Sequence, residues 1–414
     1  MNPMTDASSF PWEQGSWSAP HGGKPQITVC VAGDWAPIRQ FRSLIETSPA
    51  AVYGDLLPTL QSADLSIVNL EAPLSDRGFP VAKSGSVFKG EEKHAAGLAA
   101  IPFDVATLAN NHVFDYGLDA FQDTLAVLEQ HNIHHIGAGL SEEAAARPLV
   151  VDVKGITIGI VNFSEGEDLT TAQGNAPGVK GWDLATVTQT IRTLKQQVNF
   201  VLAIGHGGVE YIPFPPPYVA DAFQQAADAG ADVVVGHHPH VPQGLSIHKG
   251  APIFYSLGNF IFFQETDLKF RKLGYMVTIG FTKDALVSVK LAPYRITDSG
   301  LQVLQGRELD DFFAKFKEIS LPLNDPQRVS DAWNGFLHYY GASGFFDEVS
   351  MIVEEMKADP KKGAAMFRNR LTTLQHYHHW KAFLTRMVNG TLESSPKWAR
   401  LLAQEWLTAK IETY

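Results

Sequence analysis

The chain alternates two hydrophobic patterns between residue 27 and about residue 296. Short apolar runs rich in β-branched side chains predict buried strands, whereas apolar residues at helical spacing predict amphipathic helices. The strand patterns lie at residues 27–33, 65–70, 104–108, 149–153, 156–162, 199–205, 232–236, 252–257, 275–282 and 285–291. The clearest helical spacing is carried by Leu118, Phe121, Leu125 and Leu128. This alternation predicts an α/β fold in which helices cover the sheets.

The pattern changes near residue 306, where strand signals stop and amphipathic helical stretches take over. These stretches cover residues 310–317, 326–340, 346–358, 362–388 and 396–411. We therefore divide the chain into a flexible N-terminal segment at residues 1–25, an α/β domain at residues 26–305 and a helical C-terminal region at residues 306–414. The helical region is either a separate domain or a clasp over the sheet.

Composition narrows the class of protein. With 45% hydrophobic and 19% charged residues among 414, the chain is typical of folded, soluble proteins. Its net charge of −11 argues against general binding to nucleic acid and suits a site that holds divalent cations. The single cysteine, Cys30, excludes a disulfide framework within the chain and is expected to be a small buried hydrophobe.

The N-terminal residues carry no pattern of a targeting signal. Residues 1–24 are polar and rich in Pro, Ser and Gly, without the apolar core flanked by basic residues that marks a secretory signal. No run of about twenty apolar residues occurs in the sequence, so no transmembrane helix is predicted. We expect a cytoplasmic location.

Polar residues follow the predicted strands at the point where each strand ends. Asp34 closes the first strand, and Asn69 and Glu71 close the next, where strand alternation puts both on one face. A carboxylate in this position can be a hard metal ligand, and Glu71 can bridge two cations. A polar turn is the competing interpretation for each residue alone. The recurrence of the pattern favours a metal site.

The stretch after the third strand is more specific. Asn110 and Asn111 offer neutral oxygen atoms, and we expect Asn111 to be a metal ligand and Asn110 a substrate or outer contact. His112 follows directly, as a candidate proton donor. Asp115 is expected to orient the imidazole of His112, hold its tautomer and raise its pKa. An Asx turn before Gly117 explains the asparagines but not His112.

Histidines close two further strands. His206 is flanked by glycines, which permit close approach of backbone or ligand, and Glu210 follows it as a candidate substrate contact. The segment Gly236-His237-His238-Pro239-His240 places three imidazoles within four residues. His238 and His240 are separated by one residue and are expected to face one point as ligands.

The remaining histidine and amide positions are assigned supporting roles or none. His237 is expected to face away from the site and to be held by hydrogen bonds. Asn259, after the strand at residues 252–257, is a candidate substrate or outer contact. The cluster His376-Tyr377-His378-His379 lies on a predicted helix without a nearby carboxylate motif, and we interpret it as a packed or solvated helix face.

Together these motifs resemble the CapA family, named for poly-γ-glutamate capsule biosynthesis, which is similar to the calcineurin-like metallophosphoesterases. The resemblance covers about residues 27–295. It rests, in chain order, on Gly33-Asp34, Asn69-Leu70-Glu71, Asn110-Asn111-His112 with Asp115, Gly137-Ala138-Gly139, His206 with Glu210, His237-His238-Pro239-His240 and Ser256-Leu257-Gly258-Asn259. It implies a four-layer αββα sandwich of the metallophosphoesterase type, with metals at the strand ends.

The chain also departs from the metallophosphoesterase pattern. Those proteins begin with Asp-x-His, whereas Asp34 is followed by Trp35 and Ala36. Their second motif carries an aspartate where this chain offers Glu71, and the acid that follows their Asn-His pair is displaced here to Asp115. With these departures, one of the two metal positions of the metallophosphoesterases is not assured of its ligands in this chain.

Two functions remain open. One is a metal-dependent hydrolase in which two divalent cations, Mn, Fe or Zn given the mixed oxygen and nitrogen ligands, activate water for attack on a phosphoester or a glutamyl-type amide. In it, His112 protonates the leaving group of a small or oligomeric anionic substrate. The other is a non-catalytic accessory or polyanion-binding protein of capsule biosynthesis. The missing first-motif histidine favours the accessory protein, and the intact strand-end motifs favour the hydrolase.

Overall fold

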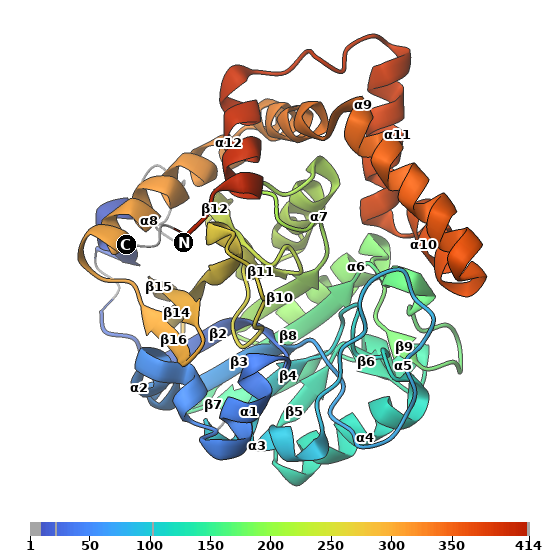
Figure 1. Ribbon diagram of the computed structural model, residues 1–414. Coiled ribbons are helices and arrows are strands. Elements are labelled where there is room, and N and C mark those ends of the chain that lie inside the picture. Colours follow the sequence, from blue (N-terminus) through green and yellow to red (C-terminus); the bar gives the residue numbers. More distant parts are fainter. Residues whose placement is uncertain (1–9, 21–22, 102, 412–414) are drawn as a thin grey trace.

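The computed structural model describes residues 10–20, 23–101 and 103–411, which fold into two large β-sheets and their covering helices (Figure 1). The first sheet has eight strands in the order β1-β15-β14-β2-β3-β4-β5, with β16 paired to β15. Its strands are β1 (Ser16–Ser18), β2 (Ile27–Trp35), β3 (Leu65–Leu70), β4 (Val105–Thr107), β5 (His134–Ile136), β14 (Leu273–Phe281), β15 (Leu286–Thr297) and β16 (Gly300–Val303). β2 to β5 are parallel, and the remaining pairs are antiparallel.

The second sheet has six strands in the order β12-β13-β11-β10-β8-β7. They are β7 (Leu149–Val153), β8 (Ile156–Ser164), β10 (Phe200–His206), β11 (Val233–His237), β12 (Pro242–His248) and β13 (Ala251–Leu257). The four inner strands are parallel, and β7 and β12 run antiparallel at the edges. A small third sheet pairs β6 (Ala138–Gly139) with β9 (Gly178–Val179).

The alternation of side chains along β2 shows how the layers are built. Val29 and Val31 belong to the core that the two sheets share, whereas Cys30 and Ala32 belong to the core between the first sheet and its helices. Successive side chains of a strand point to opposite faces, so a strand that is apolar at every position is buried on both. The expectation that Cys30 is a buried hydrophobe is confirmed, since it is 1% exposed.

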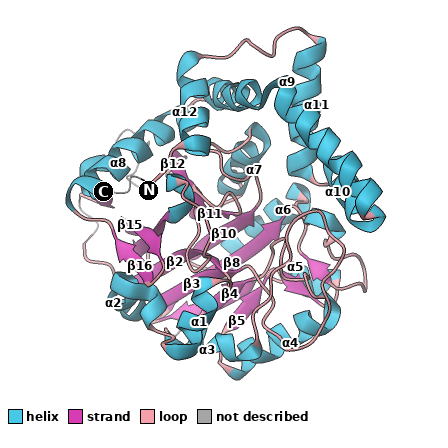
Figure 2. Cartoon of the chain, viewed as in Figure 1, coloured by secondary structure: helices cyan, strands magenta, loops and turns pink. Residues whose placement is uncertain are grey.

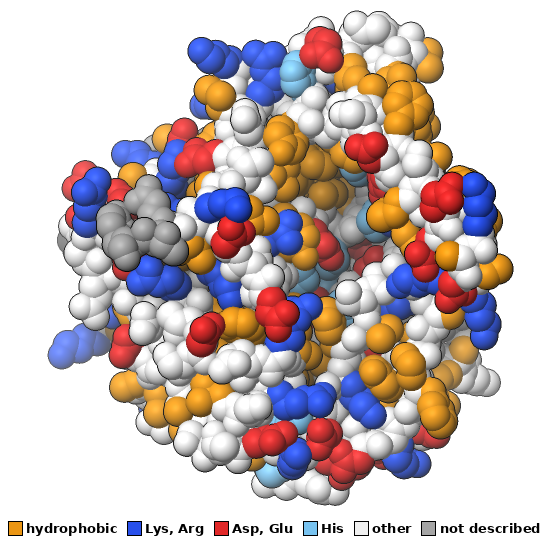
Figure 3. Space-filling view, in the orientation of Figure 1, with side chains coloured by type: hydrophobic (Ala, Val, Ile, Leu, Met, Phe, Trp, Pro, Cys, Tyr) orange, Lys and Arg blue, Asp and Glu red, His pale blue; other side chains and the backbone are white. Residues whose placement is uncertain are grey.

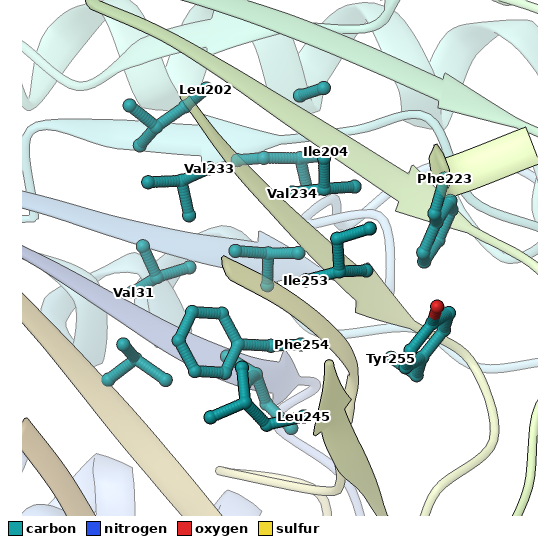
Figure 4. Close-up of a cluster of buried hydrophobic side chains, with 14 of the residues drawn as sticks. Val31, Leu202, Ile204, Phe223, Val233, Val234, Leu245, Ile253, Phe254 and Tyr255 are labelled. Carbon is teal, nitrogen blue, oxygen red and sulfur yellow. The ribbon is translucent and has the colours of Figure 1, made fainter. Parts of the chain in front are cut away.

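The two sheets face each other across one apolar core. Figure 4 shows Val31 of β2 beside Phe254 of β13, with Leu202 and Val233 of the second sheet close to them. All four side chains are fully buried. Burial of one such side chain stabilises the folded state by about 1.5–3 kcal/mol, so burial of this core is the main interaction that holds the sheets together.

Helices cover the outer face of each sheet, as the alternation of patterns predicts (Figure 2). The first sheet is covered mainly by α1 (Gln40–Thr47), α3 (Ala95–Ala100) and α4 (Gly117–Gln130), whose apolar residues pack on it. The second sheet is covered by α6 (Leu184–Lys195) and α7 (Pro217–Asp228). The shorter helices are α2 (Leu57–Ser62) and α5 (Glu142–Ala146). The four-layer αββα sandwich implied by the CapA resemblance is therefore confirmed.

The N-terminal segment differs from the flexible tail expected for residues 1–25. A 3₁₀ turn (Trp12–Gln14) and β1 attach it to the body, and Phe10, Trp12 and Trp17 are buried in the main core. These aromatic side chains remove apolar surface from water, which holds the segment against β15 and the C-terminal helices. Residues 1–9 and 21–22 of the predicted segment lie outside the described residues.

The helical C-terminal region begins where the last strand ends. α8 (Gly306–Ser320) packs its phenylalanines into the main core, and Ser320 Oγ accepts a hydrogen bond from the backbone of Leu245 in β12. The following helices are α9 (Pro326–Ala358), α10 (Pro360–Thr372), α11 (Leu374–Val388) and α12 (Lys397–Thr408). They form an arch above α7 in Figure 1. The region is thus packed on the α/β body.

The single helix expected over residues 362–388 is divided in the structure. Thr373 has extended backbone dihedrals (φ −82°, ψ 131°), so α10 ends at Thr372 and α11 begins at Leu374. The side chain of Thr373 bonds to the side chain of Asn369, one turn earlier. The break turns the first residues of α11 toward the strand ends.

In the part of the chain that the structure describes, no helix has the length and apolar character needed to cross a membrane.

Candidate metal centre

The carboxyl ends of the parallel strands of both sheets meet at one edge of the sandwich. Asp34 of β2 is in register with Asn69 of β3, and His206 of β10 with His237 of β11. A β-bridge between Asp34 and Asn259 joins the two sheets at this edge. Ligands bind at the carboxyl ends of strands in open α/β sheets, so the fold brings the strand-end motifs together where a site is expected.

Glu71 lies at the centre of two groups of buried side chains, one with His206 and His238 and the other with Asp34 and His240. Within each group the nitrogen and oxygen ligand atoms lie within 4.8 Å of one another. Oε1 of Glu71 is 3.3 Å from Nε2 of His206 and 3.9 Å from Nε2 of His240. Nδ1 of His240 is 3.3 Å from Oδ2 of Asp34. These distances suit side chains gathered around cations.

Asn111 completes the predicted set of ligands. Its Oδ1 is 3.0 Å from Nε2 of His206, and its Nδ2 donates to Glu167. The structure therefore brings together all six residues expected to hold metal: Asp34, Glu71, Asn111, His206, His238 and His240. Their roles as ligands remain predictions.

The buried polar atoms of this cluster are short of partners. Both carboxylate oxygens of Glu71, Oδ2 of Asp34 and Nδ1 of His238 have no hydrogen-bond partner among the described residues. A buried polar atom without a partner costs about 1–3 kcal/mol, and more when it is charged. Divalent cations would satisfy these oxygen and nitrogen atoms at once, so the donor set fits divalent metal ions.

The pKa values of the cluster also indicate that a cation is needed there. Burial first, and the neighbouring charge of Asp34 second, raise the pKa of Glu71 well above its usual range. Burial also acts to raise the pKa of Asp34, but His237 and His240 outweigh it and hold that pKa well below its usual range. Burial and the charge of His238 lower the pKa of His206 well below its ordinary value. Two carboxylates buried this closely require positive charge beside them.

The backbone is strained where the histidines leave β11. His238 has a φ of 98° and His240 a φ of 57°, a region of the backbone map that residues other than glycine rarely adopt. Such strain costs on the order of 1–3 kcal/mol and persists only where the surroundings impose it, which is common at functional sites. Here it turns consecutive histidine rings toward one point.

This turn also overturns the expectation that His237 faces away. Nδ1 of His237 is 3.3 Å from Oδ1 of Asp34, and neither ring nitrogen has a hydrogen-bond partner among the described residues. The expectation rested on the alternation of side chains in a strand, which ends at His237 because His238 has a positive φ. His237 therefore belongs to the cluster.

The predicted outer contacts surround the ligand cluster. Nδ2 of Asn69 donates to Asp34 at 2.8 Å and lies 3.2 Å from Nδ1 of His206. Oδ1 of Asn259 lies 2.9 Å from Nδ1 of His240, which leaves Nε2 of that ring toward Glu71. Oδ1 of Asn110 accepts from the backbone N–H of residues 112 and 113 and so shapes the turn before His112. Glu210 lines the adjoining cavity.

His112 and Asp115 form a buried pair at the edge of the cluster, and Lys83 binds the other oxygen of the carboxylate. Nδ1 of His112 is 2.6 Å from Oδ2 of Asp115, and Nζ of Lys83 is 2.9 Å from Oδ1. Burial lowers the pKa of His112, with the charge of Lys83 adding to it, and this outweighs the raising effect of Asp115. Asp115 thus acts on the pKa of His112 in the expected direction, but the net shift is downward.

Four further residues enter the site without having been predicted. Glu165 and Glu167 follow β8, and their position after a strand is the same signal that marked Asp34 and Glu71. Lys83 lies in a polar loop with no distinguishing pattern. Gln375, on α11, accepts a hydrogen bond from Nε2 of His238 at 2.6 Å, and nothing local in the sequence identifies it.

The histidine cluster on α11 has two different environments. His379 is buried among aromatic rings of α9, which agrees with a packed helix face. His376 instead lies 3.6 Å from Glu167, although the sequence around the cluster offers no carboxylate motif. The carboxylate comes from a distant part of the chain and could not be read from neighbouring residues.

A cavity of about 430 Å³ opens beside the cluster. Its lining includes Asn111, His112 and His240 from the cluster region and two arginines, Arg39 and Arg271. Neither arginine has a carboxylate within ion-pair distance among residues 10–20, 23–101 and 103–411. Figure 3 shows a hollow near the centre of this face with histidine and acidic side chains inside it.

Comparison with known proteins identifies relatives of the chain. The PGA biosynthesis protein CapA of Bacillus subtilis (strain 168) is 32% identical over 243 residues, which cover 58% of this chain and 64% of that protein. A probable polyglutamine synthesis accessory protein of Mycobacterium tuberculosis (strain H37Rv) is 26% identical over 311 residues, covering 68% of this chain and 81% of that protein. The structure of the NAD nucleotidase NadN of Haemophilus influenzae aligns with 70% of this chain and 55% of its own at 16% identity, with a TM-score of 0.41. This last likeness adds nothing to the fold described above.

The fold is a four-layer αββα sandwich with a buried cluster of histidines and carboxylates at its strand ends. The family described as bacterial capsule synthesis protein PGA_cap matches residues 28–264, more than half of the 414 residues, and the chain belongs to that family. The predicted membership of the CapA family is confirmed. The matched residues end before the helical C-terminal region begins.

Proposed function

We propose that this chain is a metal-dependent hydrolase with two divalent cations that share Glu71. The observation that carries the proposal is the pair of buried ligand groups around Glu71, one with His206 and His238 and one with Asp34 and His240. When bound, two cations of the Mn, Fe or Zn type would activate water and stabilise negative charge in the transition state. The cavity of about 430 Å³ beside them gives room for a substrate.

Residues that line the cavity would supply the proton transfer that the reaction needs. His112 lines the cavity, and its Nδ1 is held by Asp115, so Nε2 is the nitrogen left free. Nε2 would give a proton to the leaving group from the doubly protonated ring, a form that the charge of Asp115 favours and burial opposes. Such a proton transfer contributes about a hundred- to ten-thousand-fold in rate. Lys83 holds Asp115 in place and neutralises it within a buried site.

The substrate that suits this cavity is an anion with a phosphoester or a glutamyl-type amide bond. Arg39 and Arg271 supply guanidinium groups, which bind carboxylate and phosphate in a forked geometry. Arg271 lies 3.5 Å over the ring of Tyr211, which in turn stacks on His240, so its position is tied to the metal cluster. The names of the relatives, which concern poly-γ-glutamate and capsule synthesis, support an anionic polymer or its fragments.

The proposal is tested by metal analysis followed by an activity screen. Protein purified without chelator should hold close to two equivalents of divalent metal per chain. It should then hydrolyse a member of a panel of phosphomonoesters, phosphodiesters and γ-glutamyl amides in the presence of Mn²⁺, Fe²⁺ or Zn²⁺. The Glu71→Gln variant should lose both metal and activity. Activity that persists after complete removal of metal would refute the proposal.

The second candidate is a non-catalytic accessory protein that binds a polyanion. Two observations favour it: Asp34 is followed by Trp35 and Ala36 in place of the first-motif histidine, and one relative is named as a probable accessory protein. Metal-loaded protein that binds poly-γ-glutamate but turns over no member of the panel would favour this candidate. Hydrolysis that needs both metal and His112 would exclude it.

A further inference from the structure

The helical C-terminal region contacts the metal centre directly, although the family match ends at residue 264. The contact is made at the first turn of α11, where Gln375 is 6% exposed and lies against His238, which is 2% exposed. Oε1 of Gln375 is 2.6 Å from Nε2 of His238. The two residues are 137 positions apart in the sequence.

This contact decides which nitrogen of His238 carries the proton. An amide oxygen can only accept a hydrogen bond, so Nε2 of His238 must be the protonated nitrogen of the neutral ring. Nδ1 then carries the free lone pair. Nδ1 is also the atom that has no partner among the described residues, in a ring grouped with Glu71 and His206.

The orientation of the Gln375 amide is itself fixed. Its nitrogen lies 3.1 Å from Nε2 of His376, which places the oxygen on the side of His238. The backbone N–H of Gln375 donates to Glu165 at 2.7 Å, and the other oxygen of Glu165 accepts from the backbone of Gly208 at 2.7 Å. The start of α11 is therefore tied to the loop that follows His206.

A second contact from the same region reaches another predicted ligand. Nδ2 of Asn369, at the end of α10, donates to Glu167 at 2.9 Å, and Glu167 accepts from Nδ2 of Asn111 at 2.7 Å. The amide nitrogen of Asn111 is thus occupied, and its oxygen is directed toward His206. Both contacts act on the group of ligands that contains His206 and His238.

We propose that Gln375 is a positioning residue of the metal centre, which commits Nδ1 of His238 to the cation and makes the helical C-terminal region a part of the site. The inference rests on the metal centre of the proposed function but not on hydrolysis. Outer partners that orient a ligating histidine typically contribute about 10- to 100-fold in metal affinity. One of the two metal positions should depend on Gln375, and the position held by Asp34 and His240 should not.

Metal binding to the full chain tests the proposal. We would compare Gln375→Met, which keeps the size but removes the acceptor, with Gln375→Glu, which keeps an acceptor oxygen. Gln404→Met, at an exposed position of α12, is the matched control. Zn²⁺ affinity of the metal-free chain is measured by competition with a chelating dye, and the visible spectrum of bound Co²⁺ reports the ligand geometry.

Gln375→Met should weaken one of two Zn²⁺ binding events by about 10- to 100-fold and change the Co²⁺ spectrum, while the other event stays within about threefold. Gln375→Glu should bind both ions within about threefold of the unaltered chain or more tightly. If Gln375 only stabilises the fold, Gln375→Glu should lose more Zn²⁺ affinity than Gln375→Met. The reason is that a buried carboxylate without a cation destabilises the folded chain more than a methionine does.

Two results would overturn the proposal: wild-type affinity at both positions in Gln375→Met, or equal losses in Gln375→Met and Gln375→Glu. If Gln375→Met does not fold, Gln375→Glu decides alone, since a loss of tenfold or more in that variant contradicts the proposal. Unaltered protein that binds no metal would instead refute the proposed function.

Discussion

Nδ1 of His112 lies 2.6 Å from Oδ2 of Asp115 within a site where both side chains are almost fully buried. The contact holds the imidazole in one orientation, with Nε2 toward the cavity. Lys83 binds the second oxygen of Asp115, so its positive charge offsets the charge of the carboxylate. Burial of the ring and this charge together keep Asp115 from raising the pKa of His112 above its ordinary value. In the proposed function, His112 would therefore act on the substrate and His238 would hold metal.

These positions separate a proton donor from a ligand. His112→Ala should retain its metal and lose about a hundred- to ten-thousand-fold in turnover. His238→Ala should lose metal and activity together. A substrate with a good leaving group needs little protonation, so on it the defect of His112→Ala should shrink and that of His238→Ala should not. Equal loss of metal in both variants would show that His112 is a ligand.

Removal of metal should destabilise the whole sandwich, because Glu71 joins both ligand groups. A single ion at a hundred times its dissociation constant stabilises the folded state by about 2.7 kcal/mol. A chelator should therefore lower the Tm of the unaltered chain, and Zn²⁺ or Mn²⁺ should restore it. Glu71→Gln should show no metal-dependent change in Tm, whereas Asp34→Asn should keep a part of it. A chelator without effect on the Tm of the unaltered, metal-loaded chain would contradict this expectation.

Arg39 and Arg271 should govern the affinity for anions more than the rate. Replacing either with Ala removes a charged hydrogen-bond donor, which costs about 1.5–3 kcal/mol, or roughly 10- to 100-fold in KM. The kcat should change little, and the effect should weaken at high salt. Arg147→Ala, at an exposed arginine of the α/β body, is the control and should behave as the unaltered chain. Losses confined to kcat would argue against an anion site at these residues.

His379 should make the stability of the chain depend on pH. Burial among the rings of α9 and α11 lowers the pKa of His379 from its ordinary value of 6.5 to about 3. The unfolded chain therefore takes up a proton first as the pH falls below 6.5, and the stability contributed by the neutral ring is full above that pH and is lost as the pH falls toward 3. Between pH 7 and pH 5 this loss amounts to about 2 kcal/mol.

Urea unfolding at both pH values measures the effect. His379→Phe, which keeps an aromatic ring without a titrating group, should lose about 2 kcal/mol less than the unaltered chain over this interval. His131→Phe, at an exposed position, should leave the pH dependence unchanged. The same pH dependence in His379→Phe and in the unaltered chain would show that His379 is not the residue responsible.

Local pattern was sufficient for the layers and for most of the site. The runs around Val31, Ile204 and Val235 are apolar at nearly every position, and only a strand buried on both faces satisfies that pattern. Polar residues that follow such strands collect at one edge of parallel sheets. The amino-acid sequence alone therefore assigns Asp34, Glu71 and His206 to one site.

Contacts between residues far apart in the sequence were decided only by the tertiary structure, because the local spacing of apolar residues does not specify them. The alternation of side chains along a strand predicts that His237 faces away from the site. This prediction fails because a positive φ at His238 ends the strand, and that angle depends on the surrounding packing. A helical pattern shows which face of α11 is apolar but not which distant element it meets. The meeting of Gln375 with His238, across 137 residues, arises because Thr373 divides the helix and the arch packs over the strand ends. Periodicity specifies the local conformation of a segment and the face that it buries, whereas its partners follow from how all the buried faces pack together.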